Sequence, residues 1–288
     1  MAFKLLLTEN QSALSQAIRL GLEDHAYTVV APPDEFQSQD FLSQSSAAFT
    51  AFIQQQKPSL VINTLTHAGA NASAGSVIAA ACHKHQIPCL HLSSYRVFGT
   101  AYGGGDGFDE AHKPEPDDAE GKQLLAVEQA FLEASHALVL RLPWLVTHDG
   151  DNIFTRVAAR LGSGEPLAAS DICRGCPVTL DEVRRIVVAM VLQILCGAEN
   201  WGVVHLHTSD SCSEVEFADH IARLLEKEGC KPGPTEISRD EECRLEPGCG
   251  LLAGDRCKNN FGIQLRKWRL GMKPLVQKWL EQQVGVKE

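Results

Sequence analysis

The stretch LHLSSYRVFGTAYGGGDGFDEAHKPEPDDAEGKQLLAVE, residues 90–128, decides the fold. It continues an apolar run, Cys89–Ser94, whose length and composition predict a buried strand. A glycine-rich loop follows, then a turn rich in acidic residues and proline, and then a helical pattern over Gly121–Ala134. A buried strand joined to a helix in this way is typical of a parallel sheet covered by helices.

The rest of the chain repeats this alternation. Apolar runs predict strands at Phe3–Thr8, Tyr27–Ala31, Leu60–Asn63, His136–Leu142 and Trp201–Leu206. Helical spacing predicts helices at Ala13–Leu22, Phe41–Gln56, Val77–His85 and Leu275–Val284. Strands that alternate with helices indicate an α/β fold, a Rossmann-type doubly wound parallel sheet.

Two capping boxes begin further helices in the second half, at Thr179-x-x-Glu182 and Ser213-x-x-Glu216. The segment Gly229–Gly250 is rich in Pro, Gly and charge, so we expect a loop there. We expect residues 1–145 to form a dinucleotide-binding-like domain. Residues 146–288 should form a small substrate-binding lobe and a C-terminal helix, with some return of the chain to the main sheet.

Bulk properties exclude several classes of function. The net charge of −10 argues against sequence-independent nucleic-acid binding, which needs a basic surface. Met1–Thr8 is too short an apolar run for a signal peptide, and no window approaches 18 uninterrupted apolar residues, the length that would suggest a membrane span. We therefore expect a cytoplasmic protein whose ten cysteines stay reduced.

The opening stretch resembles the catalytic region of the extended short-chain dehydrogenase/reductases, in particular the dTDP-4-dehydrorhamnose reductase branch. In that family a strand ends in Ser-Thr and is followed by Val-Phe-x-Gly, an acidic-Pro segment and a helix. The resemblance extends along nearly the whole chain, through Ser93-Ser94, Val97-Phe98-Gly99, Lys57–Asn63, Arg141–Trp144, Asn152–Phe154, Gly175–Thr179, Gly202–Leu206 and Phe261–Ile263. It implies the same Rossmann-type fold.

The resemblance places the family's three cofactor-binding glycines on Glu9, Ser12 and Ser15. Glu9 is unfavourable for a dinucleotide, because its carboxylate would lie near the helix N-terminus that normally holds the pyrophosphate. The family's other cofactor-side positions fall on Asn63 and Asn71. We therefore expect these residues not to bind a cofactor, the alternative being that NADP or NAD still binds in a modified pose.

The family's catalytic tyrosine and lysine fall on Glu120 and Leu124, whereas Ser94 retains the hydroxyl that would hold a carbonyl oxygen. An ionised glutamate has no proton to donate, so Glu120 marks a degenerate position. Tyr95 would alternate away from Ser94 if the strand continued. Tyr102, in the glycine-rich loop, is therefore the candidate replacement for the lost tyrosine.

Two residues of the second half are candidates for substrate binding. By resemblance, Asn152 contacts the phosphates of a sugar nucleotide, and Arg174 lies in a loop that commonly faces that ligand. A guanidinium suits a diphosphate through paired hydrogen bonds. The alternative is that both residues only hold the loops of the lobe. Cys173-x-x-Cys176 lacks further ligands at suitable spacing, so no metal is expected.

Two hypotheses follow from these observations. The first is a catalytically inactive relative that binds a sugar nucleotide or a protein partner, with no cofactor and as a possible homodimer. The second is an active NAD(P)H-dependent sugar-nucleotide reductase or epimerase. Its site would be rebuilt around Ser94, with Tyr102 or a protonated Glu120 as the proton donor. Binding of a reduced nicotinamide cofactor distinguishes the two.

Overall fold

The protein is an α/β structure built on a six-stranded parallel sheet with the strand order β10-β5-β4-β3-β1-β2. A computed structural model describes residues 3–67, 71–100, 105, 107–134, 136–230 and 236–285. The strands of the main sheet are β1 (Lys4–Leu7), β2 (Thr28–Val30), β3 (Leu60–Asn63), β4 (Cys89–Ser94), β5 (Ala137–Leu142) and β10 (Gly202–His205). The predicted Rossmann-type sheet is confirmed.

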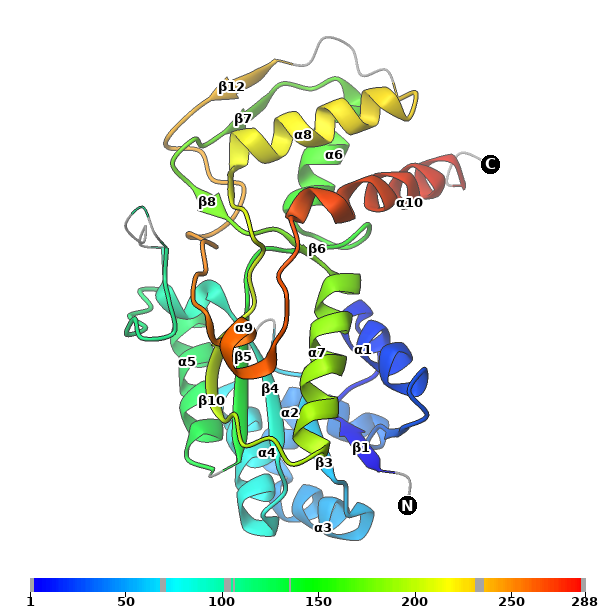
Figure 1. Ribbon diagram of the computed structural model, residues 1–288, viewed down its shortest axis with the longest axis vertical. Helices are drawn as coiled ribbons and strands as arrows, with labels where there is room; N and C mark the ends of the chain where they lie inside the picture. Colours follow the sequence, from blue (N-terminus) through cyan, green and yellow to red (C-terminus); the bar gives the residue numbers. More distant parts are fainter. Residues whose placement is uncertain are drawn as a thin grey trace.

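Two layers of helices cover the faces of this sheet (Figure 1). One layer contains α1 (Ala13–Glu23), α7 (Leu180–Leu195) and α9 (Arg256–Phe261). The other contains α2 (Gln39–Gln44), α3 (Ser46–Gln56), α4 (Ala72–His85) and α5 (Ala119–Leu132). Strand β1 shows why both faces need cover, because Leu6 packs into one core while Leu5 and Leu7 pack into the other.

A smaller lobe lies at one end of the sheet (Figure 1). Its helices are α6 (Ile153–Ser163), α8 (Glu214–Lys227) and α10 (Met272–Gly285), the last preceded by the short helix η3 (Trp268–Gly271). Short strand pairs complete it: β6 (Leu145–Val146) with β9 (Val178–Thr179), β7 (Leu167–Ala169) with β12 (Ile237–Arg239), and β8 (Arg174–Gly175) with β11 (Cys212–Ser213). Between these elements the chain returns to the main sheet through α7, β10 and α9.

Three local predictions need correction. The single helix predicted at Phe41–Gln56 is two helices, because the chain leaves the helical conformation at Ser45. The loop predicted at Gly229–Gly250 contains β12, which forms only because β7 offers a partner strand. The capping box at Thr179 is half made, since the carboxylate of Glu182 binds Arg185 instead of the helix terminus. The box at Ser213 is confirmed.

No helix of the described ranges is long and apolar enough to cross a membrane.

Candidate active site

The candidate site lies where the strands of the main sheet end, facing the smaller lobe (Figure 1). Parallel strands bring the residues that follow them to one edge of the sheet, and ligands of doubly wound folds bind at that edge. Here β1 leads into the turn at Glu9, β3 leads into Thr64, and β4 ends at Ser94.

The turn between β1 and α1 is organised around the carboxylate of Glu9. This side chain accepts hydrogen bonds from the backbone N–H groups of Gln11 (2.8 Å) and Ser12 (3.0 Å). It also accepts hydrogen bonds from the hydroxyls of Ser12 and Ser15, and one of 3.3 Å from the hydroxyl of Thr64. The sequence predicted a carboxylate at this helix terminus. Ser12 caps the helix, because its hydroxyl oxygen accepts a hydrogen bond from the N–H of Ser15.

Glu9 is charged although it is only 7 % exposed. Burial raises the pKa of its carboxyl, but the hydrogen bonds from Ser12, Ser15 and Gln11 outweigh burial, and the pKa lies below its ordinary value. A pyrophosphate in this fold needs the same N–H groups at the start of α1. In this conformation the turn does not fit a pyrophosphate, because these N–H groups already donate to the Glu9 carboxylate.

Asn63, at the end of β3, is fully buried in a polar network. Its side-chain oxygen accepts from the Thr8 hydroxyl (2.9 Å), and its amide donates to the Thr66 hydroxyl (2.7 Å). The same amide lies 3.0 Å from Nδ1 of His91. Asn63 therefore orients the residues that follow β1 and β3. Asn71 caps α4, where its side chain accepts from the N–H of Ala74.

Ser94 ends the central strand β4 and is 8 % exposed. Its hydroxyl oxygen accepts the backbone N–H of Arg96 at 3.3 Å, which begins the short helix η2 (Tyr95–Phe98). A hydroxyl that accepts one bond still has its own proton to donate. Ser94 thus occupies the position where the sequence predicted a group that holds a carbonyl oxygen.

The N-terminus of α5 is tied to η2 by ion pairs. Arg96 contacts Asp118 (Nη2–Oδ2, 2.5 Å) and Glu120 (Nη1–Oε2, 3.1 Å). The helix approaches closely because Gly121 has no side chain, and a Cβ there would lie 2.6 Å from the carbonyl oxygen of Arg96. Glu120 is therefore held in place by its contact with Arg96. Leu124, at the family's lysine position, is fully buried in the core.

Tyr95 makes a contact that the sequence did not reveal. Because β4 ends at Ser94, Tyr95 enters η2, and its hydroxyl donates to Oε2 of Glu246 at 2.9 Å. Burial first, and then the Glu246 carboxylate, raise the pKa of Tyr95 well above its ordinary value. Arg156 of α6 also donates to Glu246 (Nη2–Oε1, 2.5 Å). This cluster joins the main sheet to the lobe.

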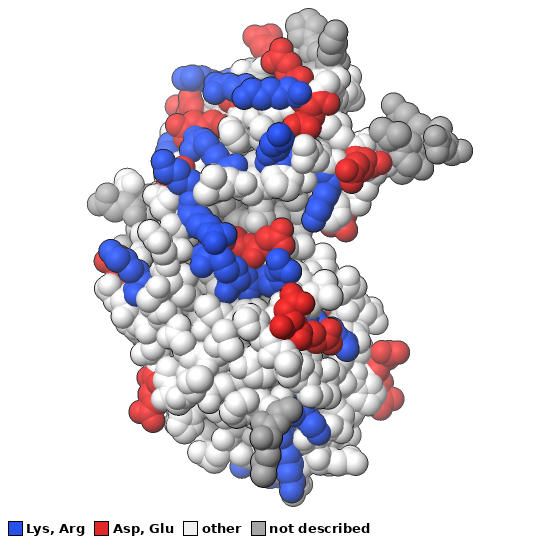
Figure 2. All heavy atoms as spheres, turned by 45° about the vertical axis from the view of Figure 1, so that its right-hand side comes forward, with Lys and Arg blue, Asp and Glu red and all other residues white. Residues whose placement is uncertain are grey.

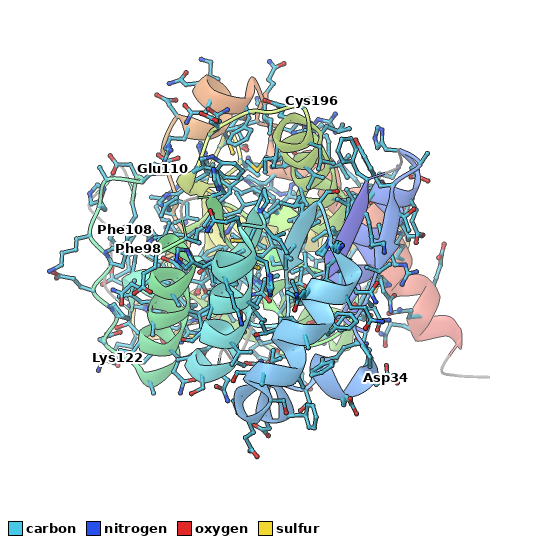
Figure 3. The ribbon with its side chains drawn as sticks, turned by 90° about the horizontal axis from the view of Figure 1, so that it is seen from below. Asp34, Phe98, Phe108, Glu110, Lys122 and Cys196 are labelled. Atoms are coloured by element: carbon cyan, nitrogen blue, oxygen red, sulfur yellow. The ribbon has the colours of Figure 1, made fainter. Side chains whose placement is uncertain are left out.

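A second buried cluster lies beside the site. The guanidinium of Arg141 on β5 donates to the Glu128 carboxylate (2.6–3.2 Å) and lies 3.2 Å from Nε2 of His205. It also lies 5.0 Å above the ring of Phe98, which stacks on Phe108 (Figure 3). Burial and the nearby Arg141 lower the pKa of His205 to about 3. Arg141 and Glu128 therefore form a fixed ion pair that connects β5 and α5.

The predicted substrate residues are engaged within the lobe. Asn152 caps α6, with its amide donating to Thr147 and to the carbonyl of Asp149. Arg174 donates to Glu216 at 3.2 Å, with its side chain 38 % exposed. Their roles toward a ligand stay predictions. Tyr102 lies outside the described residues.

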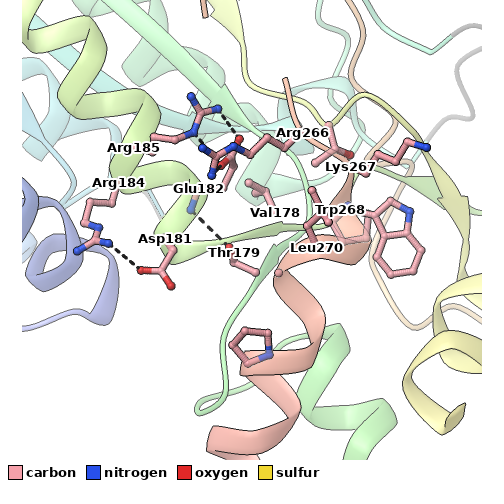
Figure 4. Close-up of a pocket in the computed structure, with 14 residues that line it drawn as sticks. Val178, Thr179, Asp181, Glu182, Arg184, Arg185, Arg266, Lys267, Trp268 and Leu270 are labelled. Atoms are coloured by element: carbon pink, nitrogen blue, oxygen red, sulfur yellow. Dashed lines mark hydrogen bonds and ion pairs between the residues drawn. The ribbon is translucent and has the colours of Figure 1, made fainter. Parts of the chain in front are cut away.

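A hollow of about 510 Å³ lies between β9, the start of α7, η3 and α10 (Figure 4). Acidic and basic side chains line it together, with Arg184 paired to Asp181 and Arg185 to Glu182. Figure 2 shows both signs of charge side by side across the middle of the molecule. Within the described residues, no group of three or more His, Cys, Asp or Glu side chains could hold a metal ion.

A doubly wound parallel sheet, a polar site at the carboxyl ends of its strands and a small lobe facing that site define a Rossmann-type fold. The RmlD substrate binding domain family matches residues 3–281, and the chain belongs to this family.

Individual relatives agree with this assignment. The dTDP-4-dehydrorhamnose reductase of Salmonella typhimurium is 22% identical over 258 residues, which cover 82% of this chain and 84% of that one. A crystal structure of a dTDP-4-dehydrorhamnose reductase from Clostridium acetobutylicum superposes with a TM-score of 0.79 at 20% identity, covering 96% of this chain and 99% of the other. The structure of the Bacillus anthracis dTDP-4-dehydrorhamnose reductase in complex with NADP superposes with a TM-score of 0.74 at 18% identity, covering 96% of this chain and 99% of the other.

These comparisons correct two expectations from the sequence. The hypothesis of a catalytically inactive relative is contradicted, because the matched Salmonella typhimurium protein and the two solved structures are dTDP-4-dehydrorhamnose reductases and the chain belongs to the RmlD substrate binding domain family. The expectation that no cofactor binds is contradicted by the solved structure with NADP. Both expectations came from lost motif residues alone, and they gave too little weight to the resemblance along the whole chain.

Proposed function

We propose that this protein is an NAD(P)H-dependent reductase of a keto group on a sugar nucleotide, with an active site rebuilt around Ser94. The observation that carries the proposal is the position of the Ser94 hydroxyl, at the carboxyl end of β4 in a fold that belongs to a reductase family. The bound nicotinamide would supply the hydride.

Ser94 is proposed to hold the substrate carbonyl. Its hydroxyl accepts the N–H of Arg96, which fixes the oxygen and leaves the hydroxyl proton free to donate to a carbonyl oxygen. A fixed donor aimed at an oxygen that gains negative charge stabilises the transition state. Asn152 and Arg174 stay candidates for the phosphates of the substrate. Arg174 suits this role better, because its side chain is partly exposed and its ion-pair partner Glu216 is exposed as well.

The proton donor is proposed to be Tyr102 or Glu120. Glu120 is engaged in an ion pair with Arg96, so its side chain would have to leave that contact before it could approach a substrate. A tyrosine keeps its proton at neutral pH and needs no such step. This difference favours Tyr102. The variants Y102F and E120Q separate the two, since only loss of the true donor should lower kcat strongly.

The proposal is tested by following oxidation of NADPH and NADH in the presence of a panel of 4-keto sugar nucleotides. S94A should lower kcat by about 10²–10³-fold, as loss of one oxyanion donor does in other enzymes. Ser93 is the matched control, because its side chain leaves the opposite face of the strand and its hydroxyl has no hydrogen-bond partner among the described residues. S93A should therefore keep the kcat of the unmodified protein. Failure of the unmodified protein to oxidise either nucleotide with any substrate would overturn the proposal.

A further inference from the structure

The carboxylate of Glu9 is bound as a ligand would be bound. Three hydroxyl groups and two backbone N–H groups donate to it, from Ser12, Ser15, Thr64 and Gln11. They come from the β1–α1 turn, from α1 itself and from the residue after β3. Phosphate oxygens take the same donors, since hydroxyl and N–H groups at a helix N-terminus bind anions of either kind.

We propose that Glu9 is an internal competitor for the pyrophosphate of the cofactor, and that it sets how tightly the cofactor binds. The inference rests on the proposed function, because it assumes that a dinucleotide binds at the family's place. It adds a determinant of affinity that the reductase activity does not imply.

Two physical effects make the competition strong. The pyrophosphate and the Glu9 carboxylate need the same N–H groups, and a backbone N–H has one proton to donate. They also carry charge of the same sign, and like charges within a few ångströms repel most at a site shielded from water. Glu9 is 7 % exposed, so its site is shielded. A dinucleotide therefore binds only when the side chain of Glu9 has left the start of α1.

Departure of Glu9 would leave a ready anion site. The hydroxyl of Ser15 already lies 2.6 Å from that of Thr64, and Ser12 caps the helix, so the donors are held by their own contacts. Serines at the family's glycine positions would then bind phosphate through side chains as well as through the backbone. The replacement of glycine by serine and the appearance of Glu9 are thus two parts of one arrangement.

The test is a calorimetric titration of the full chain with NADPH and, separately, with inorganic pyrophosphate. E9A removes the competitor and should tighten binding of both by at least about tenfold. E9Q removes the charge but keeps the length of the side chain, so its effect should be smaller. E23A is the control, because Glu23 lies at the other end of α1 in an exposed ion pair with Arg19. E23A should bind NADPH and pyrophosphate with the affinity of the unmodified protein.

The outcomes separate the inference from the proposed function. If E9A binds NADPH and pyrophosphate no more tightly than the unmodified protein, the inference is wrong, even where reductase activity is measured. If E9A binds both more tightly while neither protein reduces a keto sugar nucleotide, the inference holds and the proposed function fails. If neither protein binds either compound, both are overturned. If E9A folds poorly, the rise in melting temperature that NADPH causes in E9Q is compared with the rise in the unmodified protein, and a larger rise in E9Q supports the inference.

Discussion

The hydroxyl of Tyr95 donates a hydrogen bond of 2.9 Å to the carboxylate of Glu246, across 151 positions of sequence. Tyr95 follows the central strand β4, whereas Glu246 belongs to the segment between β12 and α9. Glu246 is in turn held by Arg156 of α6. The relationship between Tyr95 and Glu246 therefore joins the end of the main sheet to the lobe, next to Ser94.

Removing this bond should loosen the connection between the two parts. Y95F deletes the donor but keeps the ring, and it should lower the free energy of unfolding by about 1.5 kcal/mol, the value typical of a hydrogen bond to a charged group. Urea denaturation measures the change. Y27F, on the partly exposed Tyr27, should change stability by less than about 0.5 kcal/mol. Equal effects of the two variants would show that the Tyr95–Glu246 bond contributes no net stability.

Stability should fall in mild acid because buried histidines must remain neutral. Burial lowers the pKa of His67 to about 4 from an ordinary value of 6.5. Burial is also the main reason why the pKa values of His91 and His205 lie at about 3. At pH values between the ordinary pKa of 6.5 and these lowered pKa values, the unfolded chain binds protons that the folded chain does not. The free energy of unfolding therefore has its full value above pH 6.5 and falls as the pH drops toward 4.

His67 allows this dependence to be measured at one residue. H67Q removes one titrating group, so the slope of stability against pH should decrease by about 1.4 kcal/mol per pH unit in that range. Urea denaturation at a series of pH values gives both slopes. Identical slopes for H67Q and the unmodified protein would contradict the assignment of His67 as a half-buried side chain that stays neutral.

Restoring the family's lysine at position 124 should damage the fold instead of repairing the site. Leu124 is fully buried, and the apolar side chains of that core offer no hydrogen-bond acceptor to an ammonium group in its place. L124K should cost at least about 3 kcal/mol of stability. L124M, similar in volume, should cost less than about 1.5 kcal/mol. Thermal unfolding compares the two, and a stable L124K would mean that the core opens at α5.

Much of the fold follows from local sequence, because buried strands leave a visible pattern. Leu60–Asn63 and Cys89–Ser94 are predicted with the bounds that the structure has, since strands buried on both faces are unbroken apolar runs. The break at Ser45 and the strand β12 are not predictable in this way. The first depends on a single backbone conformation and the second on a partner strand about 70 residues away.

The site is predictable only in part. Ser94 and the carboxylate of Glu9 lie where the sequence places them, because both positions follow directly from a strand end. The contacts of Tyr95 with Glu246 and of Arg141 with Glu128 and His205 were missed, since no periodic pattern relates residues that meet only through tertiary packing. Lost motif residues were also a poor guide to function, because an absent side chain does not show which group replaces it.

The short edge strand β2 has a consequence for association. It offers three residues, Thr28–Val30, at one border of the sheet, and a free border can pair with a strand of another molecule. Pro32 and Pro33 follow almost at once, and proline has no N–H to donate. Any ladder built on this border therefore stops after a few hydrogen bonds. Continuation of the sheet across two copies through β2 is therefore disfavoured.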